Sequence, residues 1–370
     1  MIEFPPTAYR PAPARRFAAR LLLTPLLVSL SACSNLSYYF QAIGGHAQII
    51  QESQPITELL ADPATPAELK QKLSAVSEIR QFASEGLNLP NNGSFKSYAD
   101  LKRPFVVWNV FATPEFSVRP TEWCFAFAGC VNYRGYFSLD AAEKFALGLD
   151  PQRSDVFIGG VPAYSTLGWF SDPVLNTFVH FPEIELARLI FHELAHQVVY
   201  VSGDSEFNES FATTVERVGM RRWLNARGSQ AQTEQFATAQ QRRAQFIALM
   251  LKYRKRLEEQ FSLPISDSEK RRSKAQTFEE MAREYEQLKA SWNGFAGYDR
   301  WFVGKLGNAH LASIAVYTGL VPAFQTLLAD AGGDLKRFYS RVKEIAALPK
   351  GQRRAVLDRL AGQEQALMTD

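Results

Sequence analysis

The sequence predicts an α+β protein that is predominantly helical, with a small, mostly antiparallel sheet ahead of one central helix. Three observations support this fold class. Residues 94–138 are rich in aromatic and β-branched residues broken by prolines and a glycine, which is typical of short strands, and 155–158 adds one more. Residues 182–219 have the apolar spacing and turn signals of two successive helices. From residue 221 to the end the pattern is helical.

The first 33 residues are typical of a targeting segment. Four arginines lie between residues 10 and 20, and an apolar run too short to span a membrane follows at 21–30. The run ends in Leu-Ser-Ala before Cys33, which resembles the bacterial lipobox, whose cysteine is acylated and becomes the mature N-terminus. Since serine rather than aspartate follows Cys33, the resemblance implies a lipid anchor in the outer membrane, facing the periplasm. The alternative is an ordinary secretory signal with an incidental cysteine.

The remainder divides into four predicted regions. A helical segment covers 34–90, and the sheet with the two central helices covers 91–220. A charged helical hairpin is expected over 221–295, and a second helical region over 296–370. The hydrophobic content of 46% is that of a globular protein, and a net charge of +3 gives no reason to expect nucleic acid as a partner.

Two cysteines remain after Cys33. Cys124 and Cys130 are six residues apart, and in an oxidising compartment they are expected to form a small disulfide loop. The alternative is a pair of buried free thiols. A metal role is disfavoured because no histidine lies near them in the sequence.

The first central helix contains two histidines one turn apart. His192 and His196 are four residues apart, so their side chains share one helix face and can bind one ion. Glu193 would lie beside that ion, where its carboxylate can take a proton from water. A buried helix, apolar nearly all round, rarely holds such a polar cluster without a partner. The alternative is two buried histidines bonded to backbone carbonyls.

A third ligand is available on the second helix. A catalytic Zn²⁺ is held by three protein groups and keeps one position open. Glu209 follows His196 by thirteen residues. The segment between them predicts that the first helix ends near Val201 and that a turn at 202–204 leads into a helix running back past it. Glu209 would then face both histidines and complete a site for one Zn²⁺.

This region resembles a known family. The stretch 192–219, with His-Glu-Leu-Ala-His followed by Asn-Glu-Ser-Phe-Ala, is similar to the bacterial proteins known as predicted aminopeptidases, relatives of the gluzincins. The resemblance extends to 161–170 and 321–324, so it covers most of the chain after the leader. It implies a zincin-like metallopeptidase fold.

The family resemblance also implies roles for individual residues. His192, His196 and Glu209 would bind zinc, and Glu193 would be the general base of peptide-bond hydrolysis. The chain departs from aminopeptidase N-like and thermolysin-like enzymes, in which the ligand glutamate lies farther from the second histidine. It also has no Gly-x-Met-Glu-Asn run to hold a substrate α-amine. An aminopeptidase is therefore expected, with an endopeptidase or an envelope binding and assembly factor on the same scaffold as alternatives.

Five further residues are candidates for contact with substrate. Tyr164, in a glycine-rich and aromatic stretch, could bind substrate or donate to an oxyanion. Glu183 and Glu185 could bind a substrate amine, although the helix dipole alone would explain acidic residues in a first turn. His310 or Tyr317 could stabilise the tetrahedral intermediate. The alternative for each of these residues is a structural role.

Overall fold

The computed structural model describes residues 38–125, 129–163, 165–315 and 319–367. Residues 38–51 are helical, as expected for the start of the segment predicted over 34–90. The chain divides after Ala47 into two compact units, and the larger one, from Gln48 onward, contains the sheets and the central helices. Cys33, Tyr164 and Tyr317 lie outside the described residues.

The larger unit confirms the α+β prediction, with helices predominating. Its first part contains strand β1 (Gln54–Pro55), helices α2 (Ile56–Ala61) and α3 (Ala67–Glu85), and strand β2 (Ser97–Ala99). β2 pairs antiparallel with β1 and parallel with the short strand β8 (Val174–Leu175). The parallel pair is a departure from the otherwise antiparallel strand pairing.

The main sheet precedes the central helices, as predicted. Strand β3 (Val107–Pro114) pairs antiparallel with β6 (Arg134–Tyr136) on one side and β7 (Ser154–Val161) on the other. Helix α4 (Leu139–Leu147) connects β6 to β7. A separate two-stranded sheet of β4 (Trp123–Phe125) and β5 (Gly129–Val131) places Cys124 opposite Cys130. These two cysteines form the predicted disulfide, with Cα atoms 3.9 Å apart.

The central helices are α5 (Glu183–His196) and α6 (Ser205–Arg227). α5 ends at His196, so the predicted end near Val201 was wrong by about one turn. The reason lies in a side chain of α6. The Asn208 amide accepts from the Val201 backbone N–H and donates to the Val201 carbonyl, both at 2.8 Å, which fixes the connection outside the helix. Asp204 then caps α6 by accepting from the Phe207 N–H.

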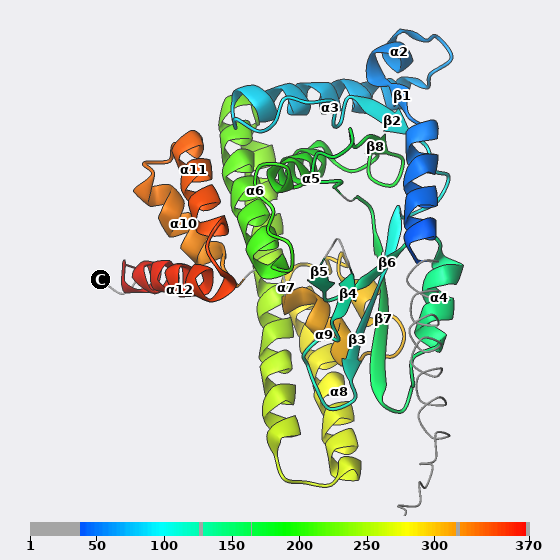
Figure 1. Cartoon of the computed structure of the whole chain (residues 1–370), viewed down its shortest axis with the longest axis vertical. Coiled ribbons are helices and arrows are strands. Elements are labelled where there is room, and N and C mark those ends of the chain that lie inside the picture. The colour runs from blue at the N-terminus through cyan, green and yellow to red at the C-terminus, as the bar shows by residue number, and fades with distance from the viewer. Residues whose placement is uncertain (1–37, 126–128, 164, 316–318, 368–370) are drawn as a thin grey trace, which may run out of the picture. The chain divides into compact units, whose positions relative to one another are not determined.

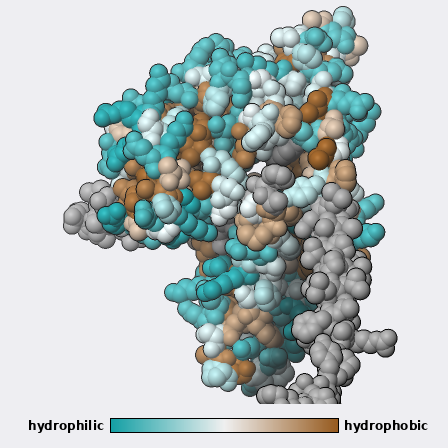
Figure 2. All heavy atoms as spheres, viewed as in Figure 1, coloured by the Kyte–Doolittle hydropathy of each residue, from teal (hydrophilic) through white to brown (hydrophobic). Residues whose placement is uncertain are grey.

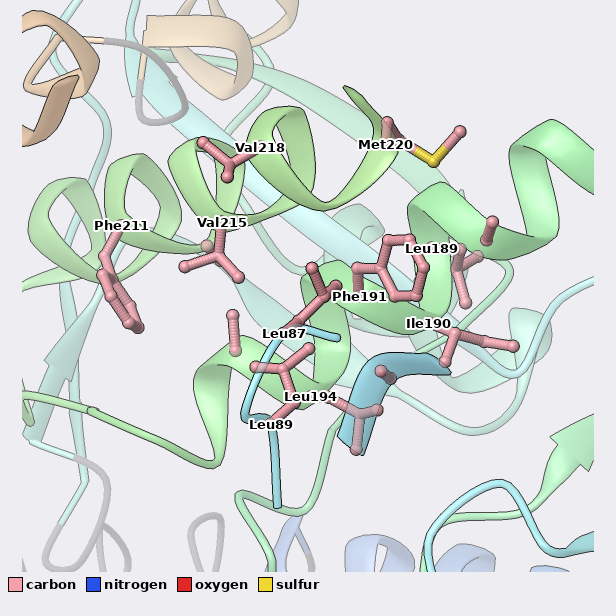
Figure 3. Packing of buried hydrophobic residues seen from close by; sticks show 14 of the residues in the cluster. Leu87, Leu89, Leu189, Ile190, Phe191, Leu194, Phe211, Val215, Val218 and Met220 are labelled. Atoms are coloured by element: carbon pink, nitrogen blue, oxygen red, sulfur yellow. The ribbon is translucent and has the colours of Figure 1, made fainter. Parts of the chain in front are cut away.

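The core is densest where α5 meets α6. Figure 3 shows Phe191 and Leu194 of α5 packed among side chains of α6 and of the segment around Leu87. Burial of each such side chain contributes about 1.5–3 kcal/mol. Gly219 permits the close approach, because a Cβ there would lie 2.8 Å from Leu87 Cδ1 and 2.9 Å from Phe191 Cδ2. The site residues are therefore fixed on a rigid helix pair.

The predicted hairpin is formed by α7 (Gln230–Ser262) and α8 (Asp267–Ser291), which lie side by side in Figure 1. Each begins with a capping box, at Ser229 and Ser266 respectively. A second core cluster, including Phe246 and Tyr285, packs between them.

The C-terminal part is helical, as expected. It contains the 3-10 helix η1 (Asp299–Phe302) and helices α9 (Asn308–Ala315), α10 (Val321–Asp330) and α11 (Leu335–Ala346). A further helix, α12 (Lys350–Leu367), was not predicted, because the last helix was expected to end at residue 348.

The surface in Figure 2 is mostly hydrophilic on the face shown, with hydrophobic residues in separate patches. Among the residues with described structure, no helix has both the length and the apolar character needed to cross a bilayer.

Candidate metal centre

The two histidines lie on one face of α5, as the spacing predicts. Their ring centroids are 4.9 Å apart, and the ring planes are nearly perpendicular, at 83°. The His192 and His196 side chains are only 15% and 9% exposed. The apolar residues on the other sides of α5 hold this face against α6.

Glu209 of α6 faces both rings. Its Oε2 lies 3.3 Å from His192 Nε2, and its Oε1 lies 3.7 Å from His196 Nε2. One ligand atom from each of these three residues lies within 4.8 Å of the other two. The structure therefore brings together His192, His196 and Glu209, which were predicted as one ligand set.

The donor set suits a divalent metal ion of the zinc type. Two imidazole nitrogens and one carboxylate oxygen are preferred zinc ligands, and three of them leave a position open for water or substrate. The second ring nitrogen of His196, Nδ1, is buried and has no hydrogen-bond partner in the described part of the chain. The other ring nitrogen, Nε2, faces the Glu209 carboxylate and is the atom available to an ion.

The Glu193 carboxyl has a pKa close to neutral pH. Burial raises the pKa of its carboxyl to about 7, and the negative charges of Glu209 and Asp172 add to the shift, while His192 opposes it. A carboxyl with a pKa near 7 can accept and release a proton at neutral pH. Glu193 follows His192 in the sequence, and the charges of His192 and Glu209 act on its carboxyl. It does not belong to the cluster of possible ligands.

Glu216 is a residue of the candidate site that the sequence reasoning missed. It is buried on α6, with its Oε2 3.0 Å from His192 Nδ1. Its Oε1 lies 3.3 Å from Arg188 and 3.6 Å from Arg243. A carboxylate that accepts from Nδ1–H directs the other nitrogen, Nε2, toward the metal position. The available signal was its seven-residue spacing from Glu209, which puts both glutamates on one face of α6.

Replacing Glu216 by glutamine is expected to weaken zinc binding by about 10–100-fold, because the imidazole loses a charged partner. Zinc affinity is measured by competition with a chromogenic chelator, and folding by circular dichroism. Glu206→Gln is the matched control, since Glu206 is on the same helix but forms a peripheral ion pair with Arg354. Equal affinity of the Glu216→Gln variant and the control would contradict the role given to Glu216.

Zinc binding should depend on pH through His192. Burial alone would lower the pKa of His192, but hydrogen bonds to Glu209 and Glu216 raise it to about 10. Burial lowers the pKa of His196 to about 4. At pH 7 zinc must therefore displace a proton from His192 but none from His196.

Apparent zinc affinity is accordingly expected to rise about tenfold per pH unit between pH 6 and 8, with about one proton released per ion. The sign follows because protons compete with the metal below the pKa of His192. Calorimetry in buffers of different ionisation enthalpy measures the proton count. A pH-independent affinity would mean that His192 is neutral before zinc binds.

Tyr200 lies four residues beyond His196 and was not singled out from the sequence. Its side chain is 44% exposed. Burial raises the pKa of its phenol, and the charge of Glu209 adds to this shift.

The other predicted site residues are more dispersed. Glu185 pairs with Arg188 at 2.8 Å, which links it indirectly to Glu216, while Glu183 is exposed. The His310 ring packs against Phe157, with centroids 4.2 Å apart, and its Nδ1 accepts from the Gly307 N–H. These contacts are those of a packed structural histidine. Tyr164 and Tyr317 lie outside the described residues.

Comparison with protein families gives one match. Residues 37–357 match the model of the family described as Putative aminopeptidase, which covers all the elements of the metal centre. Neither the search of curated proteins nor the search of solved structures gave a match.

Proposed function

The chain belongs to the Putative aminopeptidase family, and we propose that it hydrolyses peptide bonds with one Zn²⁺ held by His192, His196 and Glu209. The proposal includes a zincin-like arrangement, in which two helices supply the ligands. The observation that supports it best is the convergence of one ligand atom from each of these three residues within 4.8 Å.

When bound, zinc would supply a Lewis acid that lowers the pKa of water and polarises a carbonyl. Side chains of the protein would carry out the proton transfer and orient the ligands. Glu193 accepts the proton of the attacking water and delivers it to the leaving amine, which its pKa of about 7 permits. Glu216 holds the His192 ring in the orientation that presents Nε2 to the ligand cluster. Burial alone would raise the pKa of Glu216. The charge of Arg188, the hydrogen bond and charge of His192 and the charge of Arg243 together lower it to about 2, so Glu216 stays ionised.

The function is tested by digesting a defined peptide library with zinc-loaded protein and identifying the products by mass spectrometry. Cleavage that stops with a chelator and returns with zinc is expected, with Glu193→Gln protein as the matched control. Loss of single N-terminal residues, blocked by N-acetylation, would establish an aminopeptidase, whereas internal cleavage would establish an endopeptidase. If no peptide is cut, the enzyme proposal fails and a binding or assembly role is favoured.

We also propose that the protein is anchored to the outer membrane through a lipid on Cys33, facing the periplasm. The sequence up to Cys33 supports this, and the disulfide between Cys124 and Cys130 suits an oxidising compartment. Labelling with a radioactive fatty acid in a bacterial host tests the anchor. Label is expected in the wild type and not in Cys33→Ser, and equal labelling of both would refute it.

A further inference from the structure

An open cavity of about 320 Å³ lies on one face of the main sheet. Its floor consists of alternate residues of β3 and β7 that are paired across the two strands, including Phe111 opposite Phe157 and Asn109 opposite Gly159. Its walls come from α7, the segment 298–301 and α9.

This cavity adjoins the metal centre through Arg243. The Arg243 side chain lines the cavity, and its Nη1 lies 3.6 Å from Glu216 Oε1. The other oxygen of Glu216 lies 3.0 Å from His192 Nδ1. Two contacts therefore separate the cavity wall from a proposed zinc ligand.

The chemistry of the lining is mainly aromatic. Rings of Phe111, Phe157, Phe246, Tyr298 and Trp301 surround the space. Such rings favour an apolar, preferably aromatic, occupant that can pack at their faces and edges. Arg243 is the charged group of the lining, and its guanidinium can donate hydrogen bonds to an oxygen of a bound ligand.

Gly159 and Gly160 lie within β7 at the cavity floor. A Cβ on Gly159 would lie 3.1 Å from Cε1 of Phe157, so a larger residue would push that ring out of place. Glycine in the middle of a strand weakens it and often marks a place where another group approaches closely. Here it leaves the floor beside Asn109 clear.

We propose that this cavity is a specificity pocket, which takes a phenylalanine-sized apolar side chain of the peptide next to the bond that is cleaved. The inference rests on the proposed peptidase function and adds a substrate class to it. Arg243 would donate to a main-chain oxygen of the same peptide residue, close to the His192 side of the metal centre.

The test uses zinc-loaded protein and a panel of tetrapeptides that differ at one position, with phenylalanine, leucine, alanine or aspartate. For one position beside the cleaved bond, kcat/KM is expected to favour phenylalanine over alanine by at least about tenfold. Binding of the phenylalanine and alanine peptides to zinc-loaded Glu193→Gln protein, measured by calorimetry, gives a readout that needs no turnover.

Two variants fill the cavity from different walls. Ile247→Trp does so from α7, where Ile247 is only partly buried, and Ser313→Phe does so from α9. Each is expected to reduce the preference for phenylalanine to within about threefold, while cleavage of the alanine peptide continues. Leu251→Trp is the matched control, because Leu251 lies one turn further along α7, is 37% exposed and does not line the cavity.

The outcomes separate the two claims. Cleavage without an apolar preference, or a preference unchanged in both filled variants, overturns the pocket but leaves the peptidase function standing. Tighter binding of the phenylalanine peptide that is lost in the filled variants supports the pocket even if no peptide is cut. Equal binding of both peptides to the Glu193→Gln protein overturns the pocket.

Discussion

Replacing Glu193 by glutamine is expected to give a folded, zinc-loaded protein whose kcat is lower by about a hundredfold to ten-thousandfold. Glutamine has nearly the same shape, so the packing between α5 and α6 is kept. It cannot accept a proton from water, which the Glu193 carboxylate can do near neutral pH because burial raises its pKa to about 7.

The measurement combines kcat with zinc content and a thermal melt. Glu206→Gln is the control, because it removes an equivalent charge from an exposed ion pair on α6 and should leave all three quantities almost unchanged. Normal turnover by the Glu193→Gln protein would remove the general-base role while leaving the metal centre intact.

Replacing Glu209 by alanine is expected to abolish stable zinc binding and, with it, activity. The two imidazoles alone then remain, and two ligands hold zinc much more weakly than three. The loss should exceed the roughly 10–100-fold effect expected when only the hydrogen-bond partner Glu216 is changed. His192→Ala and His196→Ala should behave in the same way, because each removes one of the three donors.

Zinc content after dialysis against a chelator measures this effect. Folding is followed by circular dichroism, since a variant that unfolds would lose zinc for a different reason. Full zinc retention by folded Glu209→Ala protein would show that this carboxylate is not a ligand, and retention by all three variants would refute the site.

The sequence allowed the local part of the candidate metal centre to be predicted, because the relative positions of His192 and His196 follow from helical geometry alone. The predicted placement of Glu209 depended on the turn between the two helices. Its placement was predicted although the end of α5 was not. The end of α5 is set by two hydrogen bonds between the Asn208 side chain and the Val201 backbone. No pattern of apolar residues encodes such a contact of a single side chain.

The remaining features arise from contacts between distant segments. Glu216 acquires its partners only in the folded protein, where α6 packs on α5 and Arg243 of α7 approaches its carboxylate. The cavity combines β3, β7, α7 and α9, so its lining spans residues 109–314. The small sheets were predictable from their aromatic and β-branched residues, and the hairpin from its helical pattern and charge. The cavity that they enclose was not predictable. Sequence periodicity shows which face of a helix or strand is buried, but not which other element packs against that face.

The most direct test of the metal centre is an anomalous difference map at the zinc edge, from crystals of the protein grown with equimolar zinc. A single peak is expected at about 2.0–2.2 Å from Nε2 of His192, Nε2 of His196 and a carboxylate oxygen of Glu209. No peak among these three side chains, or a peak bound only by other residues, would contradict the account.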